Sequence, residues 1–463
     1  KVLNLTLKDV KIDVSDTGGD NFEFEDDQIG KAALSVEGKG NVEIELDGNN
    51  ELKSGASKAG LEKTSTGKLT LKDDNNEAGS LTATGGASAA GIGGGRDGKG
   101  ENITITGGTV NATGNEDGAG IGGGSSGSGE NITINGGEVT ASGGDNWDDC
   151  GAGIGGGNGS DGENITINGG SVTATGGSYA AGIGGGSVGF WGGESGSGKN
   201  ITINGGTVNA TGTDGGAGIG GGENGNGEDI TITGGEVKAT GGANGAGIGG
   251  DGGSGGSNVT VSGAAQVTAT AGKGSRYAGA GATIGGGGSS TQDSDGNTVP
   301  TPGTEIQADI KGLTTGYIHH IIYEQDGTTI KREWWEPVRP QPNPEDPNAP
   351  TEESNEVDLG TPGLHVETLE GDPLPFDARQ QGSTLRVTSN TLAARLHGTR
   401  QALEALQEQG VEQIQFVTSF KTTTLSVAEL LAEGGSWFAL EHNGLVSRRL
   451  SAAQAESLKC WMH

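Results

Sequence analysis

The chain has 463 residues, 98 of them glycine, and a formal net charge of −32 at pH 7. This acidity argues against a nucleic-acid partner, because phosphate repels negative charge. Collagen is excluded because the glycines do not occupy every third position. Residues 1–300 hold 85 of the glycines and one proline, whereas the remaining 163 residues hold ten prolines and all six histidines. Two regions of different amino-acid composition therefore meet near residue 300.

The region before residue 300 is built from one repeated unit. The phrase Gly-Ile-Gly-Gly, once as Thr-Ile-Gly-Gly, recurs with 29 to 36 residues between its isoleucines. Copies or variants of Asn-Ile-Thr-Ile and Thr-Val-Asn-Ala-Thr lie between them. Apolar and polar residues alternate within these phrases, which is the period of a β-strand. The isoleucines of the first phrase are Ile92, Ile121, Ile154, Ile183, Ile219, Ile248 and Ile284.

Three short strands in each turn of about 29 residues predict a right-handed parallel β-helix over residues 1–312. Glycines would serve its corners, where positive φ or close stacking excludes a Cβ atom. The near absence of proline fits, since proline cannot donate to a strand ladder. Weaker copies at Val2–Leu7, Asn41–Leu46 and Lys68–Leu71 bring the expected number of coils to about nine. A partial tenth coil is expected at 305–310.

The run Asn41-Val-Glu-Ile-Glu-Leu-Asp-Gly-Asn-Asn-Glu-Leu-Lys-Ser-Gly55 is followed by Gly-Ala-Gly-Ile-Gly-Gly-Gly repeats. Together they resemble the carbohydrate-binding β-helix domain of clostridial-type bacterial surface proteins, a family similar in fold to polysaccharide lyases. The resemblance covers about 300 residues. It implies calcium-assisted binding of a polysaccharide, such as a host or cell-wall glycan, without cleavage.

The chain changes character after the repeats. Residues 313–336 predict a strand pair, Tyr317–Tyr323 and Thr328–Trp335, with its turn at Asp326-Gly327. Residues 337–363 are a proline-rich acidic linker, and residues 364–463 predict a small α/β domain. In that domain we expect strands at 384–389, 413–420 and 437–442, and helices at 391–409, 426–433 and 451–461.

Aromatic side chains mark the units of the repeat that carry insertions. The 33-residue unit contains Trp147, the next 36-residue unit contains Phe190 and Trp191, and Tyr179 lies in the unit between them. Flat aromatic rings beside carboxylates hold sugar rings by stacking and hydrogen bonding, so these four residues are the predicted carbohydrate-binding residues. The alternative is that they pack on one another to fix a long loop.

Two sets of carboxylates are candidates for calcium, which prefers oxygen ligands. Asp145, Asp148 and Asp149 share an inserted loop. A glutamate also precedes several Asn-Ile-Thr-Ile phrases, and copies stacked ~4.8 Å apart would repel one another unless a cation relieved them. A solvated face is the alternative for this column, which consists of Glu101, Glu130 and Glu163.

Other columns of the repeat are expected to be structural. The asparagines that open the Asn-Ile-Thr-Ile phrases would stack and pair their amides along the rod. They are Asn102, Asn131, Asn164, Asn200 and Asn258, with Asp229 at the same place in one turn. The Gly-x-Gly-x-x-Gly matches of the repeat belong to corners, because a phosphate-binding loop would need a following helix.

The sequence thus predicts an extracellular protein of the bacterial surface whose rod binds polysaccharide or adheres. Lys1 in place of Met fits a product trimmed after signal removal, and no apolar run is long enough to span a membrane. The main alternative is a subunit of a surface fibre, joined through the rod ends or the C-terminal domain. A polysaccharide lyase is the least favoured, because the repeats hold no histidine and no nucleophile–base pair is suggested.

Overall fold

The computed structural model describes residues 1–19, 29–75, 78–145, 150–188, 195–293, 296–337, 364–369, 374, 376–389, 391, 393–418, 421–443 and 446–457. The chain forms two compact units, Lys1–Arg339 and Pro340–His463. Among the described residues, no helix is long and apolar enough to cross a membrane.

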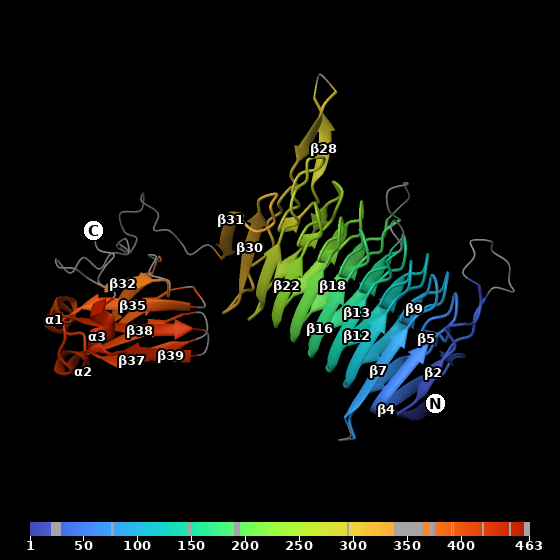
Figure 1. Cartoon of the computed structure of the whole chain (residues 1–463), viewed down its shortest axis with the longest axis horizontal. Coiled ribbons are helices and arrows are strands. Elements are labelled where there is room, and N and C mark those ends of the chain that lie inside the picture. The colour runs from blue at the N-terminus through green and yellow to red at the C-terminus, as the bar shows by residue number, and fades with distance from the viewer. Residues whose placement is uncertain are drawn as a thin grey trace. The chain divides into compact units, whose positions relative to one another are not determined.

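The first unit is a parallel β-solenoid with three faces, visible as the ladder of arrows in Figure 1. The first face consists of β1 (Val2–Lys8), the first half of β4 (Asn41–Lys53), β6 (Leu69–Lys72), β9 (Gly100–Ile105), β12 (Gly129–Ile134), β15 (Gly162–Ile167), β18 (Gly198–Ile203), β21 (Gly227–Ile232), β24 (Gly256–Ser257) and β25 (Thr260–Val261).

The second face continues each turn around a corner. It consists of β2 (Lys11–Asp13), the second half of β4, β7 (Gly79–Thr84), β10 (Thr109–Thr113), β13 (Glu138–Ser142), β16 (Ser171–Thr175), β19 (Thr207–Thr211), β22 (Glu236–Thr240), β26 (Gln266–Thr270) and β30 (Tyr317–Tyr323).

The third face has nine strands, most of them two residues long. They are β3 (Leu34–Val36), β5 (Leu61–Lys63), β8 (Ile92–Gly93), β11 (Ile121–Gly122), β14 (Ile154–Gly155), β17 (Ile183–Gly184), β20 (Ile219–Gly220), β23 (Ile248–Gly249) and β27 (Ile284–Gly285). The predicted parallel β-helix is therefore confirmed. Counted with the strands beyond this face, the solenoid has about 11 turns, against the nine expected.

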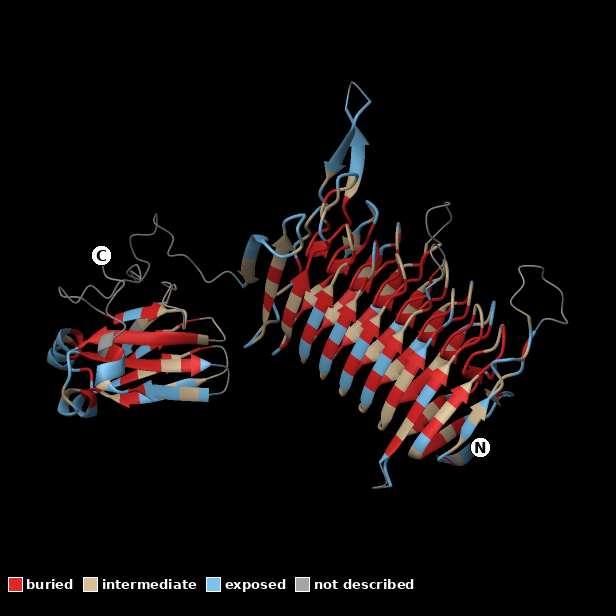
Figure 2. Cartoon of the chain, viewed as in Figure 1, coloured by how far each residue is buried: buried red, intermediate tan, exposed pale blue. Residues whose placement is uncertain are grey.

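The core of the solenoid is a set of columns in which like residues stack on like. Ile132 lies opposite Ile103 in the parallel register, and Ile121 lies opposite both Ile92 and Ile154. All of these isoleucines are fully buried, and Figure 2 shows the resulting bands of buried residues. A buried isoleucine side chain contributes roughly 1.5–3 kcal/mol, and each turn repeats this contribution.

Glycine makes the corners, as expected. Gly122, at the end of its third-face strand, has φ +139°, and a Cβ atom there would lie 1.9 Å from the carbonyl oxygen of Gly155. The expected asparagine column also sits in the left-handed region, with φ +54° at Asn131. Asparagine tolerates this conformation better than most residues, which explains its return at this position.

The strand pair after residue 313 completes the end of the solenoid. β30 extends the second face by pairing in parallel with β26, and it pairs in antiparallel fashion with β31 (Ile330–Glu336). Asp326 accepts hydrogen bonds from the backbone of the turn at Thr328 and Thr329, so the expected hairpin is confirmed. A second hairpin of β28 (Ser289–Gln292) and β29 (Thr298–Thr301) was not expected and projects from the ladder in Figure 1.

The second unit is the predicted small α/β domain. One sheet holds β32 (Leu364–Glu367), β35 (Ala393–Thr399), β38 (Trp437–Asn443) and β39 (Val446–Leu450), and the other holds β33 (Asp377–Gln381), β34 (Thr384–Thr388), β36 (Gln413–Val417) and β37 (Thr422–Ser426). Its helices are α1 (Arg400–Glu408), α2 (Val427–Ala432) and α3 (Ala452–Ser457).

One element of this unit was predicted wrongly. The helix expected at 391–409 begins only at α1, where the Thr399 hydroxyl accepts a hydrogen bond from the Ala402 amide. The preceding residues form β35, a nearly fully buried strand between β32 and β38, because tertiary packing overrides the leucine spacing. The linker beyond Pro337 and the end of the last expected helix lie outside the described residues.

Candidate functional site

Most of the predicted carbohydrate and calcium residues belong to two insertions of the solenoid, whereas Tyr179 lies in the turn between them and the glutamate column lies on the first face. Asp145 and Tyr179 are described, and both lie at the corner between the second and third faces. Five of the predicted residues lie outside the described part of the chain, namely Trp147, Asp148, Asp149, Phe190 and Trp191.

The described ends of the two insertions lie side by side. Cys150 follows the first insertion, and Ser187 precedes the second. The Cys150 amide donates to the Ser187 carbonyl over 3.1 Å, and the Ser187 amide donates back over 2.9 Å. The sequence placed these insertions in neighbouring turns. The paired backbones join the end of the first insertion, before β14, to the start of the second, after β17.

A groove of about 460 Å³ runs along the corner between the second and third faces, where Asp145 lies. Asp145 contributes an exposed carboxylate, whose Oδ1 accepts a hydrogen bond of 2.9 Å from the Ser178 hydroxyl. Its lining combines glycine backbone with hydroxyl and carboxylate groups. The lining residues are Ser142, Gly143, Asp145, Thr175, Gly176, Gly177, Ser178, Thr213 and Asp214. We call this set the corner groove.

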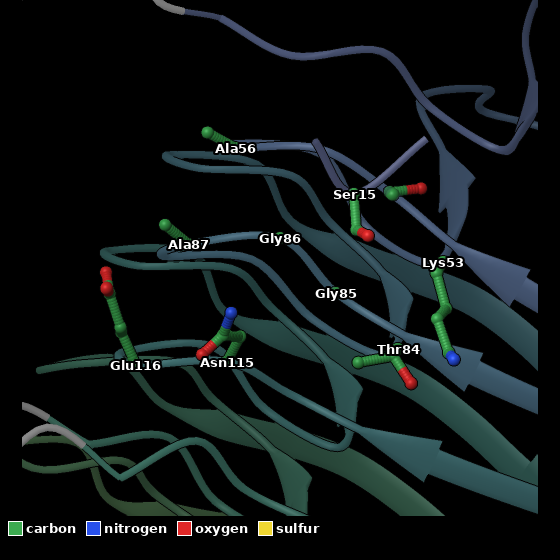
Figure 3. A pocket seen from close by; sticks show the side chains of 10 residues that line it. Ser15, Lys53, Ala56, Thr84, Gly85, Gly86, Ala87, Asn115 and Glu116 are labelled. Atoms are coloured by element: carbon green, nitrogen blue, oxygen red, sulfur yellow. The ribbon is translucent and has the colours of Figure 1, made fainter. Parts of the chain in front are cut away.

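The same corner is hollowed again in earlier turns. A cavity there has a volume of about 360 Å³. Figure 3 shows Lys53 and Thr84 on one side of it and Glu116 on the other, with Gly85 and Gly86 between them. Thr84, at the edge of this cavity, and Ser142, in the corner groove, belong to one column of the second face. The hollow is therefore a repeated feature of the rod.

The glutamate column is present, and lysines lie against it. Glu130 faces Glu101 and Glu163 in the register of the first face. Lys99 Nζ lies 2.7 Å from Glu130 Oε1 and lowers the pKa of that carboxyl, while Lys199 Nζ lies 3.7 Å from Glu163 Oε1. These lysines relieve part of the repulsion. Within the described ranges, no three His, Cys, Asp or Glu side chains are grouped to hold a metal ion, so the calcium site stays a prediction.

The expected amide ladder is confirmed at two of its steps, and a second ladder was missed. Asn200 Nδ2 donates to Asn164 Oδ1 over 2.6 Å. Asn258 Nδ2 donates to Asp229 Oδ1 over 3.0 Å, whereas Asn102 Nδ2 donates to the Thr66 carbonyl. In the second ladder, Asn168 donates to Asn135 over 2.7 Å and Asn204 donates to Asn168 over 2.8 Å. The available signal was the Asn-Gly-Gly phrase that follows three successive first-face strands, at Asn135, Asn168 and Asn204.

The sequence suggested no nucleophile–base pair, but the structure contains a threonine–histidine contact. Thr283 Oγ1 lies 2.6 Å from His320 Nδ1 and 2.9 Å from Glu305 Oε2. Thr283 stands where the other Gly-Ile-Gly-Gly phrases begin with glycine. Burial lowers the pKa of His320 to about 4, and its ring stacks on Trp334 with centroids 4.4 Å apart. Thr283 is fully buried, so its hydroxyl lies inside the end of the core, whereas Glu305 also lines a cavity of about 520 Å³.

The comparisons with known proteins bear on the fold. A family model described as a beta helix repeat matches residues 77–96, 103–125, 132–158, 165–187, 201–223 and 230–257. No curated protein and no solved structure matches the chain. The matched segments fall on consecutive turns of the solenoid, so sequence family and architecture agree. The chain therefore contains a β-helix repeat domain.

Proposed function

We propose that this protein is an extracellular bacterial surface protein whose β-helix binds polysaccharide, with calcium and without cleaving it. The observation that carries the proposal is the corner groove beside the joined ends of the two insertions. Of the four predicted aromatic residues, Tyr179 directly follows Ser178 of the groove lining, and the sequence places the other three within the two insertions.

The lining of the corner groove suits a sugar chain. Its hydroxyls can donate to and accept from sugar hydroxyls, and the carboxylates of Asp145 and Asp214 can accept two hydrogen bonds each. Equivalent positions recur every ~4.8 Å along the rod, so an extended polymer lying along the corner would meet similar groups in successive turns. Each contact of the polysaccharide with one turn raises the effective concentration of its next sugar at the following turn, so several weak contacts add.

Calcium would act at the first insertion. Asp145 is exposed at the start of this loop, and the sequence supplies Asp148 and Asp149 a few residues later. A calcium ion held by these carboxylates would also coordinate sugar hydroxyls directly, because calcium accepts six to eight oxygen ligands.

Binding to a glycan array, with and without chelator, tests the proposal. The double variant Asp145→Asn/Asp214→Asn and the double variant Trp147→Ala/Trp191→Ala are each expected to lose binding at least tenfold. Glu138→Gln is the matched control, because Glu138 is exposed on the second face and does not line the groove. No binding by the wild type in either condition would contradict the proposal.

A surface fibre is the second candidate. β1 pairs in parallel with β4, and its residues Val2 and Leu3 are 47% and 54% exposed. Exposed apolar residues on a strand at the edge of a sheet favour pairing with another chain. Negative-stain images at high protein concentration test it. Filaments would support assembly, and monodisperse short rods would count against it.

A further inference from the structure

One turn of the solenoid breaks the glycine pattern. The third glycine after the repeated isoleucine packs against the backbone of the preceding turn, and a Cβ atom at Gly157 would lie 1.9 Å from the Gly124 carbonyl oxygen. In the turn of Ile248, this position holds Asp251. The corresponding glycines are Gly95, Gly124, Gly157, Gly186, Gly222 and Gly287.

A compensating glycine makes room for the Asp251 side chain. The residue four positions before the repeated isoleucine carries a side chain in the neighbouring turns, as Tyr179 and Asn244, but is Gly215 between them. A Cβ atom at Gly215 would lie 2.7 Å from Asp251 Oδ2 and 3.1 Å from Tyr179 Cδ1. The carboxylate of Asp251 therefore fills the space left by Gly215 and lies beside the Tyr179 ring.

This carboxylate is buried without a full set of partners. Asp251 is 1% exposed, and its Oδ1 has no hydrogen-bond partner among the described residues. The Oδ1 atom of Asn244 is likewise buried without a hydrogen bond. Burial raises the pKa of Asp251 well above its ordinary value, and the negative charge of Glu223 raises it further. A buried carboxylate in this position must bind a proton or a cation, because an uncompensated buried charge is strongly destabilising.

We propose that the carboxylates of Asp251 and Glu223, with the amide oxygen of Asn244, bind one calcium ion at the turn of Ile248. Two carboxylates balance the charge of a divalent cation, and carboxylate, amide and backbone oxygens with water are the ligands that calcium takes. The Glu223 amide donates to the Tyr179 carbonyl over 2.8 Å, so Glu223 is held next to the tyrosine whose ring lies beside the Asp251 carboxylate. The site is separate from the Asp145 loop and does not depend on polysaccharide binding.

Calcium titration of the whole chain, stripped with chelator, tests this proposal. Asp251→Asn removes the charge at constant shape, and Asp251→Gly restores the residue found in the other turns, so at least one variant should fold. Both are expected to bind one calcium ion fewer per chain than the wild type and to lose part of the calcium-induced rise in melting temperature. Asp229→Asn is the matched control, since it removes a carboxylate from the same region and restores the asparagine of the other turns.

Terbium emission gives a local readout. Terbium replaces calcium and is excited by a nearby aromatic ring, so Tyr179→Phe should lower the sensitised emission while leaving the number of calcium ions unchanged. Equal calcium stoichiometry and equal melting shifts in the wild type and Asp251→Asn would overturn the proposal. An Asp145→Asn chain that still binds calcium through Asp251 would separate this site from the one in the proposed function.

Discussion

The β-solenoid and the C-terminal unit bury their cores by different means. In the solenoid, each buried position repeats one residue type, as where Ile183 lies opposite both Ile154 and Ile219. In the C-terminal unit, the core around Phe416 is assembled from different side chains. The Phe416 ring packs against His442, and Arg395 is also buried in this unit. The difference indicates that backbone stacking decides which substitutions destabilise the solenoid. In the C-terminal unit, particular side-chain pairs decide this.

The largest effect is expected from a corner glycine. Gly122→Ala places a Cβ atom against the Gly155 carbonyl at a φ of +139°, so it should lower the free energy of unfolding of the solenoid by ~3 kcal/mol or more. Gly410→Ala is the counterpart in the other unit, where φ is +82° and nothing lies within 4 Å of the new Cβ atom; it should cost ~1 kcal/mol. Denaturant unfolding measures both. Equal losses of unfolding free energy in Gly122→Ala and Gly410→Ala would contradict this difference between the two units.

A similar loss in the C-terminal unit should follow from removing one side chain. Arg395 donates to Glu367 Oε1 and Glu441 Oε1, each over 2.8 Å, and to the Leu369 carbonyl over 2.7 Å. Arg395→Ala leaves two largely buried carboxylates without their cation and should cost about 3 kcal/mol. Only the transition of this unit should move. Removing Arg400 from its exposed ion pair with Glu404 should have little effect, and a comparable loss there would contradict the argument.

A third effect depends on pH. Burial lowers the pKa of His320 from 6.5 to about 4, so between these values the unfolded chain binds more protons than the folded one. The stability that neutral His320 contributes is present above pH 6.5 and declines as the pH falls to about 4, by up to ~3 kcal/mol. Burial raises the pKa of Glu305 and Glu336. These two carboxyls therefore make the folded state more stable as the pH falls, which opposes the effect of His320.

The difference between the wild type and His320→Asn isolates the histidine. Unfolding at pH 7 and pH 5 should show the wild type losing its advantage over the variant at the lower pH. In the C-terminal unit, burial likewise lowers the pKa of His442 to about 4. A pH-independent difference between the wild type and His320→Asn would show that the ring titrates normally.

The smallest effect is expected from the amide ladder. Asn168 donates to Asn135 and accepts from Asn204 on an exposed edge of the solenoid. Asn168→Ala removes both contacts from a solvated position and should cost ~1 kcal/mol. Asn209→Ala, an exposed second-face residue outside the ladder, serves as the reference. A loss above that of Arg395→Ala would show that side-chain pairs matter as much in the solenoid as in the other unit.

The sequence was informative where one physical rule repeats. Strand alternation and corner glycines recur in turn after turn, so the solenoid could be predicted with its strands close to their true bounds. The C-terminal unit depends on contacts between distant residues, such as Arg395 with Glu367 and Glu441. Five of its eight described strands were not predicted: β32, β33, β37 and β39 were missed, and β35 was taken for part of a helix. At the candidate site, the repeat pattern pointed to the insertions. It could not show that the side chain of Asp251 fills the space left by Gly215, because these residues belong to different turns that meet only in the folded stack.

The in-register stacking of the turns also makes the length of the rod adjustable in fixed steps. Adding or deleting one whole repeat leaves each column of buried residues continuous and moves everything beyond it by ~4.8 Å. The hollow lined by Thr84 and Glu116 and the corner groove are carried by different turns. Their separation could therefore be tuned by the number of repeats between them, with no redesign of either hollow or of the core.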